Sequence, residues 1–163
     1  MPWRCRRLRM TRANSSISFS CSTMSWPVGV SVRAGQPTGY PHPNQFYYNR
    51  VERGQALQVA GVVRIGGCGG ELYRPYMIGP RTAHMEKLWT AARDACLMQK
   101  DLSRKGTLCS DVAYEIHKFQ VGEGVQDYIY HRPAHGEGME GHQPPYLSLG
   151  EHTVLDTGMM FSV

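Results

Sequence analysis

The stretch over residues 131–146 constrains the fold most strongly, because it suits neither a helix nor a regular strand. Its sequence is HRPAHGEGMEGHQPPY, and glycine and proline at this density destabilise the interiors of both elements. Such a stretch forms either a functional site or an energetically costly loop. Its imidazoles can bind a metal or transfer protons near neutral pH. Since His135 and His142 are seven residues apart, too far for a single helical turn, we expect them to face one cleft from successive strand ends.

A β-hairpin is predicted upstream of this stretch. Residues 56–65 are rich in β-branched side chains, Gly66-Gly67 is a tight-turn signal, and residues 70–78 return as the partner strand. Glu71 lies on the returning strand. Taken by itself, Glu71 fits a solvent-facing residue paired with Arg74 as well as it fits a site residue.

Two helices are predicted after the hairpin. The first has a buried stripe at helical spacing, formed by Met85, Leu88, Trp89, Ala92, Cys96 and Met98. Gly106 separates it from the second, for which Ser110 and Asp111 supply the cap and first turn. The buried edge of the second helix is Val112, Ile116 and Phe119, and Gly122 with Gly124 ends it. The apolar stripe of the first helix is typical of core packing.

The remaining segments complete an α+β arrangement. Residues 125–130 are predicted to form a strand that leads into the histidine-rich stretch, and residues 159–163 form an apolar strand after a connector over 147–155. Residues 45–50 are a further candidate strand start. The order of hairpin, helices and strands predicts antiparallel sheet with covering helices.

Charge is divided unevenly along the chain. Residues 1–51 carry seven arginines and no acid, so residues 52–163 hold the other 11 of 18 basic residues against all 13 acids. The folded part is therefore near neutral, which argues against a nucleic-acid partner. No run of eighteen apolar residues exists in the sequence, so no membrane span is expected.

The first 27 residues are expected to lie outside the folded domain, which we place at residues 28–163. They are rich in arginine and serine and lack acids, which is typical of an organellar transit peptide but equally fits an unrelated start. We expect a cytoplasmic protein, or a mitochondrial one if the leader is a transit peptide. The five cysteines are odd in number and form no C-x-x-C pair, which favours reduced thiols.

A family resemblance follows from the histidine-rich stretch. The turn His135-Gly136-Glu137-Gly138, followed by His142-Gln143-Pro144-Pro145-Tyr146, and the terminal Gly158-Met159-Met160-Phe161-Ser162-Val163 resemble the pita-bread metallopeptidases. This family includes methionine aminopeptidase, Xaa-Pro aminopeptidase, prolidase and creatinase. The resemblance covers about residues 28–163 and implies a partial pita-bread domain, C-terminally incomplete because the family's two glutamate ligands would follow position 163.

The resemblance also implies roles for individual residues. His135 matches a metal ligand, and Glu71 stands where relatives carry a bridging aspartate. Position 60, eleven residues earlier, matches a second aspartate but holds Ala60. His142 and His42 match histidines that contact the substrate. Complete relatives use divalent ions of the Mn, Fe, Co or Zn class. With two of five usual ligands, we expect this chain not to retain them.

The expected function is that of a metal-dependent hydrolase of the Xaa-Pro aminopeptidase or creatinase-like group, acting on a peptide or small molecule, with this chain an inactive fragment. Two alternatives stay open: a lyase-like member of the same fold that acts on dimethylsulfoniopropionate, and a non-catalytic member that binds peptides or partners, which Ala60 favours. A homodimer is a further expectation for a full-length form.

Overall fold

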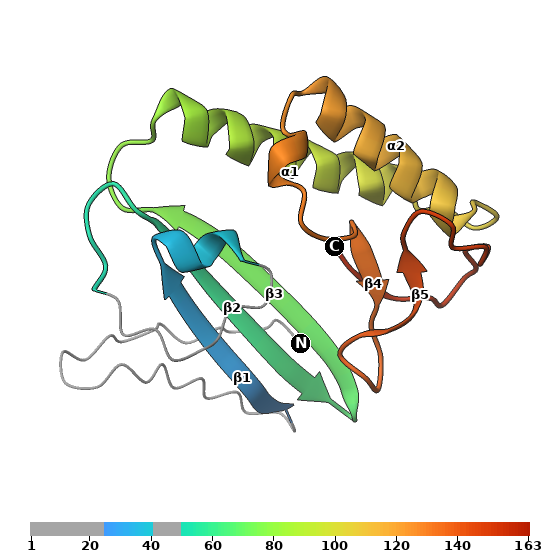
Figure 1. Cartoon of the computed structure of the whole chain (residues 1–163). Helices are drawn as coiled ribbons and strands as arrows, with labels where there is room; N and C mark the ends of the chain where they lie inside the picture. The colour runs from blue at the N-terminus through green and yellow to red at the C-terminus, as the bar shows by residue number, and fades with distance from the viewer. Residues whose placement is uncertain (1–24, 41–49) are drawn as a thin grey trace, which may run out of the picture.

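The computed structural model describes residues 25–40 and 50–163, which form two small antiparallel sheets and a pair of α-helices (Figure 1). The first sheet has the strand order β1 (Ser25–Ala34), β2 (Ala56–Ile65), β3 (Cys68–Met77). A short 3-10 helix, η1 (Gln36–Gly39), follows β1. The predicted hairpin is confirmed: Gly66 and Gly67 have φ of 59° and 89°, as a two-residue turn requires. Strand β1 was not predicted.

The first sheet has two unlike faces. Directly opposed residues of antiparallel strands share a face, and Tyr73 and Glu71 of β3 oppose Ala60 and Val62 of β2. This face, called the site face, holds the buried Ala60 and the partly buried Glu71 and Tyr73. The opposite face leaves large apolar side chains exposed, among them Val32, Val63, Leu72 and Tyr76. Burial in this sheet is therefore concentrated near the site.

Helix α1 (Ala83–Leu102) begins at a capping residue, since the Thr82 side chain accepts a hydrogen bond from the backbone N–H of Met85. Its predicted buried stripe is one residue out of register. The buried residues are Ala91, Ala95 and Gln99, whereas Ala92 and Cys96 are exposed. Helix α1 packs on α2 (Figure 1).

Trp89 is only half-buried, which also departs from the predicted stripe. The guanidinium groups of Arg81 and Arg93 lie 4.5 and 5.2 Å from its ring centroid, so cation–π contacts hold it at the surface. Neither described helix combines the length and apolar composition of a membrane-spanning segment.

Helix α2 (Cys109–Gly122) starts without the predicted side-chain cap. Its N-cap is Leu108, and the N–H groups of Cys109 and Ser110 donate to the carbonyl oxygens of Thr153 and Glu151 over 2.9 and 3.1 Å. A later backbone segment thus satisfies donors that a capping side chain would otherwise take. Val112 and Ile116 are buried as predicted, while Phe119 is half-buried.

The strand predicted over residues 125–130 is wrong. This segment contains the 3-10 helix η2 (Gln126–Tyr128). Gly124, with φ of 66°, turns the chain, and the N–H groups of Tyr128 and Ile129 donate locally to Val125 and Gln126. Local bonding thereby replaces the ladder that a strand would need.

The second sheet has the order β5-β4-β6, with β4 (Ala134–Gly136), β5 (Gln143–Leu147) and β6 (Phe161–Ser162). The terminal strand is shorter than predicted, because the N–H of Met159 donates to Asp156 in a turn. The register of β4 and β5 shifts between His135 and Gly136. This irregularity lies within the histidine-rich stretch.

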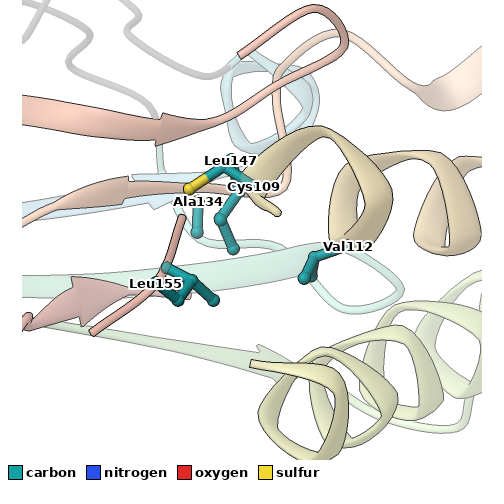
Figure 2. Packing of buried hydrophobic residues seen from close by; sticks show 5 residues of the cluster. All are labelled: Cys109, Val112, Ala134, Leu147 and Leu155. Atoms are coloured by element: carbon teal, nitrogen blue, oxygen red, sulfur yellow. The ribbon is translucent and has the colours of Figure 1, made fainter. Parts of the chain in front are cut away.

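The main core lies between α2 and the second sheet (Figure 2). Its members are apolar side chains with at most 4% exposure: Cys109, Val112, Ala134, Leu147 and Leu155. Leu102 and Phe161 pack against them. The thiols of Cys68, Cys96 and Cys109 are free. The best-packed part of the described chain therefore supports β4, which carries His135.

Candidate metal centre

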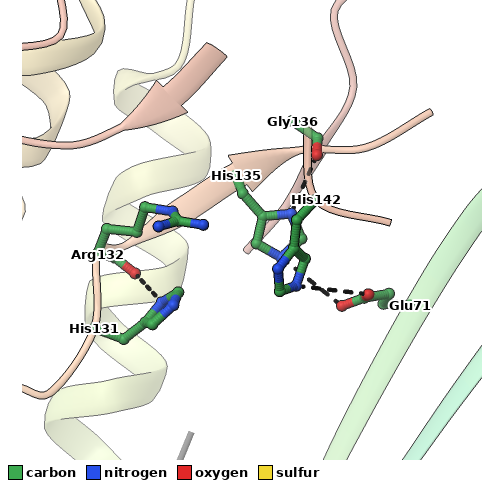
Figure 3. A network of polar contacts seen from close by, with 6 residues as sticks. All are labelled: Glu71, His131, Arg132, His135, Gly136 and His142. Atoms are coloured by element: carbon green, nitrogen blue, oxygen red, sulfur yellow. Dashed lines mark hydrogen bonds and ion pairs between the residues drawn. The ribbon is translucent and has the colours of Figure 1, made fainter. Parts of the chain in front are cut away.

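Three side chains from distant parts of the sequence meet between the two sheets. Glu71 projects from β3, His135 from β4, and His142 immediately precedes β5 (Figure 3). His135 Nε2 lies 3.8 Å from Glu71 Oε2, and His142 Nε2 lies 4.0 Å from Glu71 Oε1. The imidazole centroids are 3.9 Å apart. The two histidines do meet at successive strands, as their spacing predicted.

His135 is held in one orientation. It is 7% exposed, and its Nδ1 lies 3.1 Å from the carbonyl oxygen of Gly136. Because a carbonyl oxygen only accepts, Nδ1 carries the proton in this hydrogen bond. Nε2 is then the lone-pair nitrogen and faces Glu71, which is the tautomer that a metal-binding imidazole needs.

Glycines allow the two histidine-bearing segments to cross closely. A Cβ at Gly136 would lie 2.5 Å from the carbonyl oxygen of Gln143 and 2.8 Å from that of Pro144, and one at Gly138 would lie 2.7 Å from the Gln143 side-chain amide. Real Cβ atoms do not approach backbone this closely. Glycine at these positions therefore makes the contact of the histidine rings sterically feasible.

Hydrogen bonds fix the β2–β3 hairpin against the histidine loop, defined here as residues 135–142. The N–H of Gly69 donates to the carbonyl oxygen of Gly138 over 2.7 Å. Arg64 Nη1 donates to the carbonyl oxygen of Met139 over 2.5 Å. Gly69 and Glu71 are two residues apart on β3 and therefore point to the same face of the sheet. The hydrogen bonds thus place the Glu71 carboxylate beside the imidazoles.

Glu71 does not take the solvent-facing alternative. Its side chain is 8% exposed, and Arg74 instead donates to the carbonyl oxygen of Tyr73 over 2.9 Å. The negative charge of Glu71 also acts on Tyr73, whose pKa is raised first by burial and then by this carboxylate. Glu71 is thus a buried acid of the site face.

A second buried acid, Glu137, escaped the sequence reasoning. It is 6% exposed, and neither carboxylate oxygen has a hydrogen-bond partner among the described residues. Burial raises its pKa and the charge of Glu71 raises it further, while His135 and Arg64 lower it. Sequence offered no signal that separates Glu137 from the exposed Glu140, because burial here depends on tertiary packing.

The other sequence-derived positions lie apart from this cluster. Ala60 is 4% exposed on the site face and is the diagonal neighbour of Glu71, since it opposes Tyr73. It offers no ligand atom. His42 lies outside the described residues.

The three clustered donors fit one divalent ion. Their ligand atoms lie within 4.8 Å of one another. Ligands about 2.0–2.2 Å from a common ion are roughly 3–3.5 Å apart, so the separations of 3.8 and 4.0 Å would close by a small side-chain movement. Two imidazoles and a carboxylate suit Zn, Mn, Fe or Co. Among the described residues, this set does not suffice for a pair of ions.

Solved prolidase and dipeptidase structures share the chain path of this fold, which is of the pita-bread type. Prolidase from Thermococcus sibiricus matches with a TM-score of 0.77 and 22% identity, over 81% of this chain and 36% of that one. Dipeptidase PepE from Mycobacterium ulcerans matches with a TM-score of 0.78 and 24% identity, over 83% and 36%. The described fold is thus a partial pita-bread domain.

The chain belongs to metallopeptidase family M24, whose model matches residues 5–163. An Xaa-Pro dipeptidase of Lactobacillus delbrueckii subsp. lactis is 27% identical over 132 residues, 81% of this chain and 36% of that protein. A probable dipeptidase PepE of Mycobacterium tuberculosis is 30% identical over 107 residues, 63% of this chain and 28% of that protein. The chain therefore spans about a third of the length of these curated relatives.

Proposed function

We propose that this chain supplies the part of a metal centre that contains Glu71, His135 and His142, in a hydrolase similar to Xaa-Pro dipeptidases or aminopeptidases. The observation that carries the proposal is the convergence of Glu71, His135 and His142 on one point between the two sheets. Membership of a metallopeptidase family and the dipeptidase names of its relatives support it.

In this proposal each residue has a distinct task. Glu71 and His135, both nearly buried, hold the ion, and the Gly136 carbonyl keeps the imidazole oriented. A bound divalent ion supplies Lewis-acid polarisation of an amide carbonyl and acidifies water. His142, with 37% of its side chain exposed, is accessible to a peptide and donates from its imidazole to the substrate carbonyl. His42 is proposed as a second substrate contact.

We also propose that the 163-residue chain alone does not turn over substrate. Ala60 cannot ligate, and the two described residues assigned to the ion, Glu71 and His135, are too few to hold a pair of ions. A missing carboxylate removes both charge and geometry from a two-ion site. The alanine at position 60 also supports the alternative that this chain is a non-catalytic member of the family, which binds peptides without cleaving them.

Metal content and hydrolysis test the proposal together. The chain is dialysed against Mn²⁺, its bound metal is measured, and Xaa-Pro dipeptides are assayed beside dimethylsulfoniopropionate. The sequence predicted that the ions of complete relatives are not retained. Because Glu71 and His135 lie close enough to share a single ion, we now expect one ion per chain, its loss in His135→Ala, and no turnover. His131→Ala is the matched control, since His131 is exposed and lies outside the cluster. Equal metal in wild type and His135→Ala, or two ions with turnover, would contradict the proposal.

Ala60→Asp distinguishes a degraded site from a binding-only protein. An aspartate there would be the diagonal neighbour of Glu71, within reach of its carboxylate. We expect the variant to bind more Mn²⁺ than wild type if the site has merely lost one ligand. Unchanged metal content would favour the binding-only member.

A further inference from the structure

Glu137 is a buried carboxylate without a hydrogen-bond partner among the described residues. At 6% exposure, both of its oxygens are shielded. Native structures pair nearly all such groups, and an isolated buried charge costs far more than an isolated dipole. The buried and unpartnered carboxyl group therefore fits a site that a cation could complete.

The backbone of β3 is shaped to admit this carboxylate. A Cβ at Gly69 would lie 2.5 Å from Glu137 Oε1, so the acid occupies the space that only glycine leaves open. The hydrogen bond from Gly69 N–H to the Gly138 carbonyl, 2.7 Å long, fixes this contact. Gly69 and Glu71 are alternate residues of one strand, roughly 6.5–7 Å apart. Glu137 consequently lies on the same patch of the site face as Glu71.

The nearest basic side chain does not balance the two acids. Arg64 opposes Gly69 in the ladder, but its Nη1 donates to the carbonyl oxygens of Gly67 and Met139, over 3.2 and 2.5 Å. Glu71 and Glu137 thus place two carboxyl groups on one patch of the site face, and the described hydrogen bonds give Glu137 no cationic partner. A divalent cation between them would neutralise both.

We propose that Glu137 is an additional carboxylate ligand of the ion held by Glu71 and His135. This inference rests on the proposed metal centre and assigns it a donor from the glycine turn that follows His135. The ion is of the Mn, Fe, Co or Zn class, which accepts mixed carboxylate and imidazole donors. Glu137 is not among the donors whose ligand atoms already lie within 4.8 Å of one another, so its side chain would have to rotate from Gly69 toward Glu71. It would then supply a carboxylate that Ala60 does not.

Isothermal titration with Mn²⁺ tests the assignment on the whole chain. Glu137→Gln keeps the shape and removes the charge, whereas Glu140→Gln makes the same change three residues away at an exposed position. We expect Glu137→Gln to weaken Mn²⁺ binding about 10–100-fold and Glu140→Gln to leave it within about twofold. Glu137→Asp, which retains the charge, should recover part of the affinity.

Thermal melting separates a lost ligand from a damaged fold. Without metal, Glu137→Gln should melt at or above the wild-type temperature, because it removes an unpaired buried charge. With Mn²⁺, its upward shift in melting temperature should be smaller than that of wild type. Wild-type affinity in Glu137→Gln would overturn this inference alone, as would equal losses in Glu137→Gln and Glu137→Asp. Absence of Mn²⁺ binding by wild type would overturn it together with the proposed function.

Discussion

The two sheets bury their apolar side chains very differently. The first has three ten-residue strands, yet Ala34 and Ala60 are its buried apolar side chains among the described residues. The second has short strands but packs on α2 around Leu147 and Leu155. The sheet with the longer strands is thus not the one that buries more apolar side chains. Most of the apolar stabilisation comes from the packing of the second sheet on α2.

This contrast determines how the candidate site is assembled. The well-packed side carries the histidines, and the poorly packed side carries Glu71. Their relative position depends on hydrogen bonds from the β2–β3 hairpin to the histidine loop, chiefly those of Gly69 on β3 and Arg64 on β2. The site should therefore respond separately to damage in the core and to damage at this contact.

The largest predicted effect separates the two sheets directly. Leu147 is fully buried and Leu72 is 54% exposed. Leu147→Ala should cost about 2–5 kcal/mol of unfolding free energy, since it leaves a cavity, whereas Leu72→Ala should change it by less than about 0.5 kcal/mol. Urea unfolding of both variants measures this. Similar costs would mean that the first sheet contributes as much packing as the second.

A smaller effect is expected at the crossing of the histidine-bearing segments. Gly136→Ala places a Cβ against the backbone at Gln143 and Pro144 and should cost about 1–3 kcal/mol, with weaker Mn²⁺ binding. Gly61→Ala is the control within the first sheet, where an added Cβ meets nothing within 4 Å. Thermal melting and metal titration report both effects. A Gly136→Ala variant that matches Gly61→Ala would show that the close crossing is unnecessary.

Removal of the hydrogen bond between the first sheet and the histidine loop should cost less stability still. Arg64→Ala removes the bond to the Met139 carbonyl and should cost about 0.5–1.5 kcal/mol. It should also speed hydrogen exchange at the Gly69 amide. Arg74→Ala is the matched control, because Arg74 bonds only to the adjacent carbonyl of Tyr73 in the described hydrogen bonds. Unchanged exchange at Gly69 in Arg64→Ala would argue against Arg64 as a docking residue.

The smallest effect concerns the segment between β5 and β6, whose carbonyl oxygens cap the start of α2. The Thr153 hydroxyl donates to Glu151 over 2.7 Å and, with the Thr153 N–H, lowers the pKa of Glu151. A carboxylate with a lowered pKa stabilises the fold above its ordinary value of about 4.3. That contribution is lost as pH falls through the lowered folded-state pKa.

Thr153→Val should raise the pKa of Glu151, so the variant should lose less stability than wild type over this acidic range. Melting temperatures measured from neutral to acidic pH test this, with Thr157→Val as the control. The gap between Thr153→Val and wild type should close on acidification. A gap that is independent of pH would mean that the hydroxyl acts through packing.

Local signals in the sequence predicted the parts of the fold that depend on neighbouring residues. Gly66-Gly67 specified the hairpin turn and thereby the strand that presents Glu71. The seven-residue spacing of His135 and His142 predicted that they face one cleft, and the glycine at position 136 makes the close approach of their segments possible. The position of α1 was predicted for the same reason, since its periodicity is local.

Tertiary effects explain the remaining differences. The buried face of α1 includes Ala91 and Ala95, whereas the more hydrophobic Trp89 is held by two arginines. Residues 125–130 have strand-like composition but bond locally after Gly124. Burial of Glu137 depends on Gly69, 68 positions earlier. None of these partners can be deduced from sequence spacing.

The backbone cap of α2 has a consequence for the order of folding. The first turn of this helix donates to carbonyls of Thr153 and Glu151, more than forty positions later in the chain. On a ribosome, the helix start emerges well before the residues that cap it, and closing such a loop carries an entropic cost. A nascent chain that ends before Glu151 would have an uncapped α2, so the helix and the second sheet should mature together as one cooperative unit.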